Sequence, residues 1–277
     1  MTERSPEELF DCELRLLLEA VYHRYQHDFR HYAIASLRRR VSQAMQRFGC
    51  RSVSQLQARV LHEPDVFAQI LEFLTVQVSE MFRDPPYWRA LREQVLPVLS
   101  TYPSLKFWVA GCSAGEEVYS LAILLDEAGL LPRTLIYATD INPAALRTAE
   151  AGVYALERVP VFTRNYQRAS GTRPLSDFYT AGYGNVVFDR RLRARVTFSD
   201  HSLATDEVFA EVHLISCRNV LIYFDTPLQD RAVGLFHRSL APRGFLGLGT
   251  HERLDLVRHP GLFEEVVRAE RLYRRLT

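Results

Sequence analysis

KFWVAGCSAGEEVYSLAILLD, residues 106–126, is the most informative segment of the chain. Residues 107–110 form a short apolar run rich in aromatic and β-branched side chains, which is typical of a buried strand. A loop of small residues follows between Gly111 and Gly115. After it, four apolar residues fall on one face of a helix: Val118, Leu121, Ala122 and Leu125. A strand, a small-residue loop and a helix open nucleotide-binding α/β domains, and such glycines let a ligand approach the backbone closely.

Two acidic residues, Glu116 and Glu117, begin this predicted helix. A dinucleotide presents its pyrophosphate to a helix N-terminus, and two carboxylates at that place would repel it. They suit a cationic, hydroxyl-rich ligand such as S-adenosylmethionine (SAM), which carries a sulfonium, an ammonium and a ribose. The alternative is that both acids only complement the helix dipole.

Asp140 follows the next predicted strand, residues 134–139. An acid about 20 residues beyond a glycine loop is where a ribose-binding carboxylate belongs. Asn142 and Pro143 then begin a helix, with proline at its first position. The alternative is therefore that Asp140 only caps that helix, but we expect it to bind a ribose.

Composition and charge exclude several classes of protein. The 277 residues suggest one large or two modest domains, and no run of 18 apolar residues predicts a membrane helix. The acidic, polar N-terminus does not resemble a signal peptide. The four cysteines are scattered and the nine histidines form no HxxxH cluster, so we expect free thiols, a cytoplasmic location and no metal site. The net charge of +1 gives no general attraction for nucleic acid.

The chain is predicted to contain three parts. Residues 1–80 have only helical patterns, and Ser5 with Glu8 forms a capping box at their start. Residues 81–105 form a linker and a helix. Residues 106–277 form the α/β domain.

A small β-subdomain is predicted at about residues 180–200. Apolar and polar residues alternate over residues 191–198, which indicates a half-exposed strand, and residues 186–188 would pair with it across a turn at Asp189. Residues 152–185 are expected to be irregular. Later apolar runs predict strands, the last two antiparallel, at residues 212–217, 245–249, 263–267 and 271–276.

Five motifs now define a resemblance, and they are FRD (82–84), AGCSAGEEVYSLA (110–122), ATDIN (138–142), FSDHSL (198–203) and SCRNVLIYF (216–224). In this order they resemble the chemotaxis receptor methyltransferases, the CheR family, from the N-terminal helices to the C-terminus. The resemblance implies an α/β fold: a Rossmann-like SAM-dependent methyltransferase domain with a small inserted antiparallel β-subdomain, preceded by an all-α N-terminal domain. It also implies transfer of methyl groups from SAM to chemoreceptor glutamates, with S-adenosylhomocysteine (SAH) as product.

The resemblance also assigns residues to the cofactor and the reaction. The implied cofactor-binding residues are Gln77, Ser79, Arg83, Gly111, Glu116, Asp140, Ser202, Leu203, Cys217, Arg218 and Asn219. Glu116 would bind the polar end of SAM, Asp140 the ribose, and Ser202 and Leu203 would lie near the adenine. Arg83 and Tyr223 would flank the reacting methyl as the catalytic pair. The family usually has Asn and Thr in place of Gln77 and Ser79, and Asn in place of Ser202.

The chemistry requires little from the protein. A glutamate γ-carboxylate is ionised at pH 7 and is itself the nucleophile, so no general base is needed. Arg83 can pair with that carboxylate, and its alternative is a salt bridge within the linker. Tyr223 can donate a hydrogen bond or pack beside the sulfonium, and its alternative is a buried core tyrosine.

The predicted partners are the glutamate-rich helical domains of chemoreceptors. Seven arginines and no acid lie between Phe29 and His62, and Arg38, Arg39 and Arg40 are expected on the outward sides of a helix with no acidic partner nearby in sequence. A receptor C-terminal peptide could add a strand to the β-subdomain beside Arg191, Arg193 and Arg195. In both places a solvated charged surface is the alternative.

Three other functions compete, namely a nucleic-acid methyltransferase, a small-molecule carboxyl methyltransferase and a SAM-binding regulatory module without turnover. The Asn/Asp-Pro-Pro-aromatic motif expected for base amines is absent, so we expect no nucleic-acid substrate. We expect a monomeric enzyme that does not insert into membranes.

Overall fold

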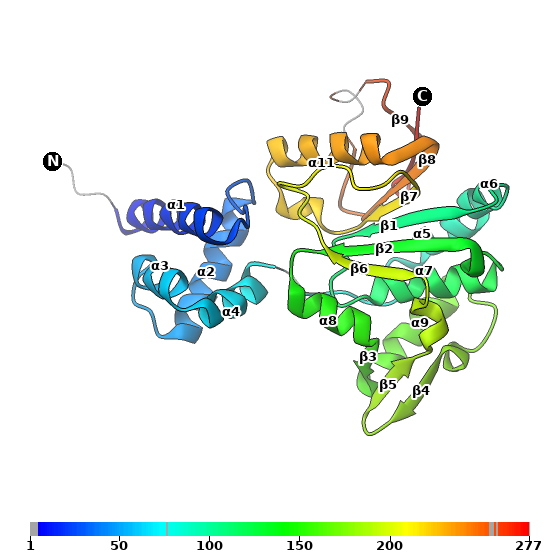
Figure 1. The fold of residues 1–277 in the computed structure, drawn as a ribbon, viewed down its shortest axis with the longest axis horizontal. Coiled ribbons are helices and arrows are strands. Elements are labelled where there is room, and N and C mark those ends of the chain that lie inside the picture. The colour runs from blue at the N-terminus through cyan, green and yellow to red at the C-terminus, as the bar shows by residue number, and fades with distance from the viewer. Residues whose placement is uncertain (1–4, 76, 255–257, 259, 277) are drawn as a thin grey trace. The chain divides into compact units, whose positions relative to one another are not determined.

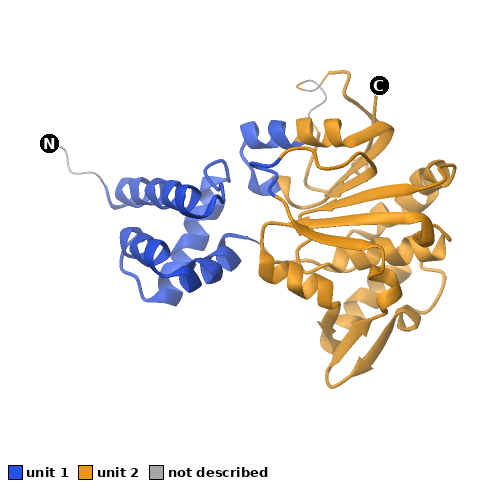
Figure 2. Ribbon diagram, in the orientation of Figure 1, with its two compact units in different colours: residues 1–76, 202–206, 222–232 blue, residues 77–201, 207–221, 233–277 orange. Residues whose placement is uncertain are grey.

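The computed structural model describes residues 5–75, 77–254, 258 and 260–276. The chain forms two compact units, coloured blue and orange in Figure 2. The helical unit comprises residues 1–76, 202–206 and 222–232, and the sheet unit comprises residues 77–201, 207–221 and 233–277. No helix in the described part of the chain is long and apolar enough to cross a membrane.

The N-terminal part of the helical unit contains four helices, α1 (Pro6–Tyr25), α2 (Ile34–Phe48), α3 (Val53–His62) and α4 (Pro64–Leu74). The predicted capping box is present at α1, because Ser5 Oγ accepts from the Glu8 amide and Glu8 Oε2 from the Ser5 amide. Gly49 ends α2 in the left-handed conformation, with φ of 66°. The expected helices are therefore confirmed.

The expected exposure of the three α2 arginines is confirmed for Arg38 and Arg39 and is wrong for Arg40. Arg38 forms an ion pair with Asp11 of α1. Arg40 is buried, because it follows the buried Leu37 by three residues and therefore lies on the same face of the helix. Its guanidinium donates to the Leu74 carbonyl oxygen at the end of α4. Arg39 alone of the three is exposed without a recorded ion pair among the described residues.

The sheet unit is built on seven strands in the order β6-β2-β1-β7-β8-β10-β9 (Figure 1). Their bounds are β1 (Leu105–Ala110), β2 (Thr134–Asp140), β6 (Val196–Asp200), β7 (Val212–Cys217), β8 (Leu240–Leu248), β9 (Phe263–Val267) and β10 (Leu272–Arg275). The first five in this order are parallel, whereas β10 pairs antiparallel with both β8 and β9. This confirms the predicted Rossmann-like domain and the antiparallel pair at its end.

Helices and short turns connect these strands. They are α5 (Pro85–Ala90), a π-helical turn (Leu91–Val95), α6 (Leu96–Leu99), α7 (Glu116–Glu127), α8 (Pro143–Ala151), α9 (Val159–Arg168), α10 (Arg190–Arg193) and α11 (Thr226–Ser239), with 3₁₀ turns at Leu131–Arg133, Leu156–Arg158, Leu175–Phe178 and Leu221–Tyr223. Apolar residues of α7 share one core with β1, as expected for a parallel sheet that is covered by helices.

The register of the central strands determines where the site lies. Ala110 of β1 pairs with Thr139 of β2, and Val109 pairs with Ser216 of β7. The carboxyl ends of three parallel strands therefore meet at one edge of the sheet, which is where open α/β sheets bind ligands.

The inserted β-subdomain is present, and its predicted strand at residues 186–188 is confirmed as part of β5, but the predicted partner strand is wrong. It consists of β3 (Val153–Ala155), β5 (Asn185–Phe188) and β4 (Tyr179–Gly182), in that spatial order and antiparallel. The partner of β5 is β4, and the turn between them, Tyr183 and Gly184, has positive φ at both residues, as a two-residue hairpin requires.

The alternation at residues 191–198 does not form the second strand of a hairpin. The Asp189 carboxylate accepts from the Arg191 amide and so begins the short helix α10, after which the chain enters the main sheet as β6. Arg191 pairs with Asp189 at 3.0 Å, and Arg195 donates to the Thr134 carbonyl oxygen at 3.2 Å. The expected row of arginines along a subdomain edge is therefore absent. Residues 152–185, expected to be irregular, contain α9, β3 and β4.

Candidate active site

The loop between β1 and α7 is held close to its neighbours. Gly111 and Gly115 have φ of 71° and 93°, which favours glycine. A Cβ atom on Gly115 would lie 2.7 Å from the Ala149 side chain, and one on Gly111 would lie 2.5 Å from Val220. Side chains at either position would therefore displace the segments that border this edge of the sheet.

Asp140 lies at the end of β2 and is buried. One carboxylate oxygen accepts from the Ser113 amide at 2.8 Å, and the other accepts from the Asn142 amide at 2.9 Å. Burial raises the pKa of the Asp140 carboxyl, and these two hydrogen bonds oppose that rise. The cap of α8 is Asn142, whose side chain accepts from the amides of Ala144 and Ala145. Helix capping therefore does not account for Asp140.

Glu116, the first residue of α7, is 1% exposed. Its Oε1 accepts from Arg158 Nη1 at 2.7 Å, whereas its Oε2 is buried and has no hydrogen-bond partner among the described residues. Burial raises the pKa of the Glu116 carboxyl, and Arg158 and, more weakly, the Ser79 side chain oppose this. Complementing the helix dipole alone would not require so complete a burial.

Glu117 belongs to a different network. Its carboxylate accepts from Ser216 Oγ at 2.6 Å and from Arg218 Nη1 at 3.2 Å. Arg218 Nη2 also donates to Asp84 and to the carbonyl oxygen of Arg83, at 2.8 and 2.9 Å. The Arg218 guanidinium thus connects three of the sequence motifs.

The surroundings of Arg218 also enclose it. Its guanidinium carbon lies 4.2 Å from the ring centre of Tyr87 and 5.6 Å from that of Trp88, and its side chain is 1% exposed. Cys217 beside it is fully buried, and burial raises the pKa of its thiol. The side chain of Arg218 therefore fixes the FRD segment in place.

Arg83 follows Phe82 and precedes Asp84, both of which have positive φ. Its carbonyl oxygen accepts from Trp88 Nε1 at 2.9 Å as well as from Arg218, so its backbone is held on two sides. Its guanidinium has no carboxylate partner among the described residues. The alternative of a linker salt bridge therefore finds no support.

Gln77 and Ser79 are brought to the same edge of the sheet. Gln77 Oε1 accepts from the hydroxyl of Ser113 at 2.7 Å, which connects it to the loop that Asp140 binds. The Ser79 carbonyl oxygen accepts from Arg158 Nη2. Ser113 therefore links Gln77 to Asp140, and Arg158 links Ser79 to Glu116.

Asn219 is held in the left-handed conformation, with φ of 60°, by Glu252. The two oxygens of the buried Glu252 carboxylate accept from the amides of Asn219 and Val220, both at 2.8 Å, and of Gly249 at 2.6 Å. The side-chain nitrogen of Asn219 is buried without a hydrogen-bond partner among the described residues.

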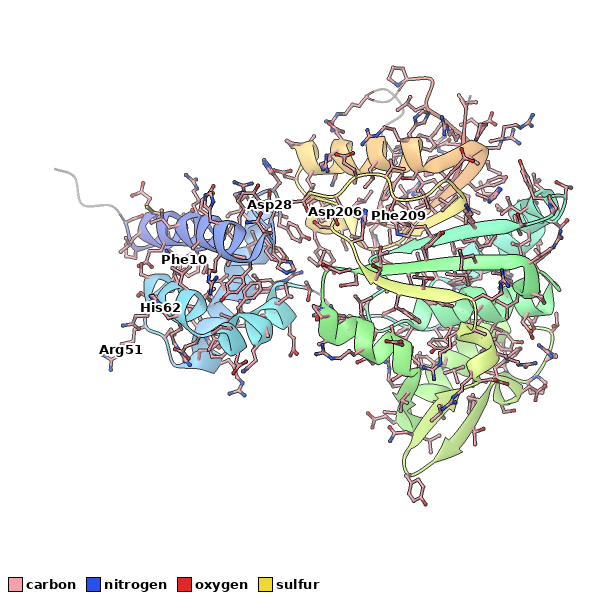
Figure 3. All side chains as sticks on the ribbon, in the orientation of Figure 1. Phe10, Asp28, Arg51, His62, Asp206 and Phe209 are labelled. Atoms are coloured by element: carbon pink, nitrogen blue, oxygen red, sulfur yellow. The ribbon has the colours of Figure 1, made fainter. Side chains whose placement is uncertain are left out.

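Ser202, Leu203 and Tyr223 belong to the helical unit. The Ser202 amide donates to Asp206, whose side chain is labelled in Figure 3, and Leu203 is buried. The Tyr223 carbonyl oxygen accepts from the Ala33 amide at 2.7 Å.

Tyr223 is in contact with Arg40. The Arg40 guanidinium carbon lies 4.8 Å from the centre of the Tyr223 ring. Tyr223 is only partly buried, so it is not a core tyrosine.

Sequence reasoning did not single out Arg158 or Glu252. Arg158 is 42 residues from Glu116, and Glu252 is more than 30 from Asn219 and Val220. No local periodicity or spacing connects residues so far apart, so neither partner could be identified from sequence pattern alone.

The side chains at this edge of the sheet fit SAM. Asp140 offers carboxylate oxygens at the end of β2, and Glu116 Oε2 and Asn219 Nδ2 are buried polar atoms that find no hydrogen-bond partner in the described part of the chain. A ribose and an ammonium can use the carboxylates, and an adenine can accept from an amide. Among the described residues no cluster of three His, Cys, Asp or Glu could hold a metal ion.

The sheet order, the glycine loop and the acid at the end of β2 define a SAM-dependent methyltransferase. The model of the SAM-binding domain of CheR methyltransferases matches residues 77–270, and that of their all-alpha domain matches residues 13–75. The chain therefore belongs to the CheR methyltransferase family, and its cofactor is SAM.

Individual relatives agree with this assignment. The chain is 55% identical over 265 residues to Cher3 of Pseudomonas putida, covering 96% of this chain and 97% of Cher3. It is 34% identical over 188 residues to the chemotaxis protein methyltransferase of Listeria monocytogenes, covering 67% and 69% of the two chains. It is 33% identical over 206 residues to chemotaxis protein methyltransferase 2 of Pseudomonas aeruginosa, covering 71% and 70%.

Proposed function

We propose that this enzyme transfers the methyl group of SAM to glutamate γ-carboxylates of chemoreceptors in the cytoplasm. The products are glutamate methyl esters and SAH, and the role is adaptation in chemotaxis or a related chemosensory pathway. The names of the relatives in Listeria and Pseudomonas aeruginosa support the pathway.

The observation that carries the choice of a carboxylate substrate is the state of Arg83. Its backbone is fixed by Arg218 and Trp88, while its guanidinium has no carboxylate partner among the described residues. A guanidinium binds a carboxylate with two parallel hydrogen bonds, so Arg83 is suited to orient an incoming glutamate.

Bound SAM supplies an electrophilic methyl group on a sulfonium, and the protein has to position its acceptor. A glutamate carboxylate is ionised at neutral pH and attacks without a general base. Arg83 would hold one face of the carboxylate, and the Tyr223 hydroxyl would border the methyl. Catalysis would then come from alignment of the carboxylate oxygen, the methyl carbon and the sulfur.

The predicted cofactor-binding residues can be assigned to the chemical groups of SAM that they would bind or to the pocket around them. Asp140 would accept from the ribose hydroxyls, and Glu116 from the ammonium. Ser202 and Leu203 would lie near the adenine, Asn219 would line the pocket after β7, and Gln77 and Ser79 would lie over the cofactor. Their side chains supply the acceptors and donors that each of these groups needs.

We also propose that α2 binds the receptor. The positions of its arginines reduce the number of residues that could do so. Of the three predicted arginines, Arg40 is buried and Arg38 is paired with Asp11, so Arg39 is the exposed one without an ion pair among the described residues. An acidic receptor helix would be attracted to this surface, and salt would weaken the attraction. A solvated surface remains the competing interpretation.

The test is incubation of the enzyme with labelled SAM and membranes from the source cell. We expect label in a receptor-sized band as a methyl ester that base hydrolyses. Arg83→Ala should abolish most of it, and the exposed Arg89→Ala on α5 is the matched control. Label in a small molecule would favour a small-molecule substrate. SAH binding without any transfer would favour a regulatory module.

A further inference from the structure

Arg158 joins three segments that lie far apart in the sequence. It ends the 3₁₀ turn Leu156–Arg158, just before α9. Its Nη1 lies 2.7 Å from Oε1 of Glu116, and its Nη2 donates to the carbonyl oxygen of Ser79. Its guanidinium carbon lies 4.9 Å from the ring centre of Phe162, so the aromatic ring limits where the side chain can turn. The guanidinium is therefore fixed from three directions.

The fixed guanidinium of Arg158 determines the state of the Glu116 carboxylate. A carboxylate that is 1% exposed loses its hydration and would take up a proton unless a cation compensates for that loss. Arg158 is the ion-pair partner recorded for it, at Oε1. The other oxygen, Oε2, is buried without a hydrogen-bond partner among the described residues. Such an atom is costly to leave unpaired, and a bound cation would satisfy it.

We propose that Arg158 is a positioning residue for the amino-acid end of SAM. It holds Glu116 in the ionised form and in the rotamer that leaves Oε2 for the cofactor ammonium, and it fixes the Ser79 peptide beside it. This inference rests on SAM as cofactor and does not depend on which molecule receives the methyl group.

The competing interpretation is an ion pair that only stabilises the fold. The Arg158 side chain is 35% exposed, so its removal need not unfold the protein. The two interpretations differ in which part of the cofactor they affect. A positioning role changes affinity only for ligands that carry the amino-acid end, whereas a general loss of structure weakens every nucleoside ligand.

Calorimetry with SAH and with methylthioadenosine separates the two interpretations. Methylthioadenosine keeps the adenosine and the sulfur but lacks the ammonium and the carboxylate. For Arg158→Met we expect SAH affinity to fall about tenfold or more, because the charged hydrogen bond between Glu116 and the SAH ammonium is lost. The affinity for methylthioadenosine, which has no ammonium, should change less than about twofold. Arg158→Lys should recover part of the SAH affinity. Arg164→Met, at an exposed position of α9, is the matched control and should change neither.

A double-mutant cycle with Glu116→Gln tests whether Arg158 acts through Glu116. Once Glu116 is neutral, Arg158→Met should weaken SAH binding little further, so the two losses should not add. Equal losses for both ligands, unchanged SAH affinity in Arg158→Met, or additive losses in the cycle would each overturn the proposal. Absence of SAH binding by the wild-type protein would instead contradict the cofactor assignment itself.

Discussion

Two regions of the molecule each enclose a buried arginine beside a candidate catalytic residue, and they do so differently. Arg218 of the sheet unit pairs with Asp84 and Glu117 and donates to the Arg83 carbonyl oxygen. Arg40 of the helical unit donates to one carbonyl oxygen and lies over Tyr223, but it has no carboxylate partner among the described residues. The buried charge of Arg218 is therefore balanced by two carboxylates, whereas that of Arg40 has no carboxylate beside it among the described residues.

The difference has an energetic consequence. Removing Arg218 would leave two carboxylates beside a buried cavity without their cation, whereas removing Arg40 would also remove an uncompensated buried charge. Burial lowers the pKa of Arg40, which is the direction expected for a cation without an anion nearby. We therefore expect Arg218 to matter mainly for stability and Arg40 mainly for the orientation of Tyr223.

The largest expected effect is on the free energy of unfolding. Arg218→Met should lower it by about 3–5 kcal/mol, the range for breaking a buried ion pair from one side. Arg40→Met should lower it by only about 1 kcal/mol, the net contribution of one hydrogen bond. Urea denaturation of both variants measures the difference, and equal losses would show that the carboxylates around Arg218 do not matter.

The second expected effect is on turnover. Arg83→Ala and Tyr223→Phe should each lower it about 100-fold, since misplacing a reacting group costs roughly that factor. SAH affinity should change much less, because the role we propose for each residue concerns the transferred methyl group and not the nucleoside. Single-turnover kinetics together with SAH titration make the comparison. If a variant keeps wild-type turnover, the residue changed in it takes no part in the mechanism.

The third effect concerns the cofactor alone. Asp140→Ala should lose two ribose hydrogen bonds, about 1–3 kcal/mol of SAH binding free energy. The same change also removes the carboxylate that holds the Ser113 amide, so the melting temperature should be recorded beside the affinity. Unchanged affinity by calorimetry would show that the ribose lies elsewhere.

The smallest effect is expected on the surface of α2. Arg39→Glu should raise the Michaelis constant for receptor a few-fold at low salt, because exposed charge pairs contribute about 0.2–1 kcal/mol. SAH affinity should stay the same, and high salt should remove the difference. Arg51→Glu, at another exposed position of the helical unit, is the control. If both variants methylate receptor like the wild type, the surface is only solvated.

Local sequence patterns predicted much of this structure because they report local physics. The run at residues 107–110 and the capping box of Ser5 and Glu8 correspond to β1 and the start of α1. The glycine loop and Asp140 were placed correctly at the edge of the sheet, because parallel strands bring their carboxyl ends together.

The errors arose where distant residues determine the outcome. The buried Arg40 has its hydrogen-bond acceptor in α4, and Arg158 reaches a glutamate from another part of the sheet unit. The alternation at residues 191–198 has the period of a strand in a hairpin, but its first residues belong to α10 and only those from Val196 onward form a strand, which pairs with β2 in the main sheet. The hairpin turn at Tyr183 and Gly184 lacks the Asn-Gly signal that would have identified it.

The central claim is that a glutamate γ-carboxylate receives the methyl group, and the most direct measurement is mass spectrometric mapping of the modified receptor. The receptor should be incubated with SAM and either wild-type enzyme or Arg83→Ala, then digested and sequenced. We predict methyl esters on glutamates of the cytoplasmic helical domain, and mild base treatment should remove them. No ester should form in the Arg83→Ala reaction or where those glutamates are changed to glutamine. Methylation on nitrogen, on another molecule, or independent of Arg83 would contradict the claim.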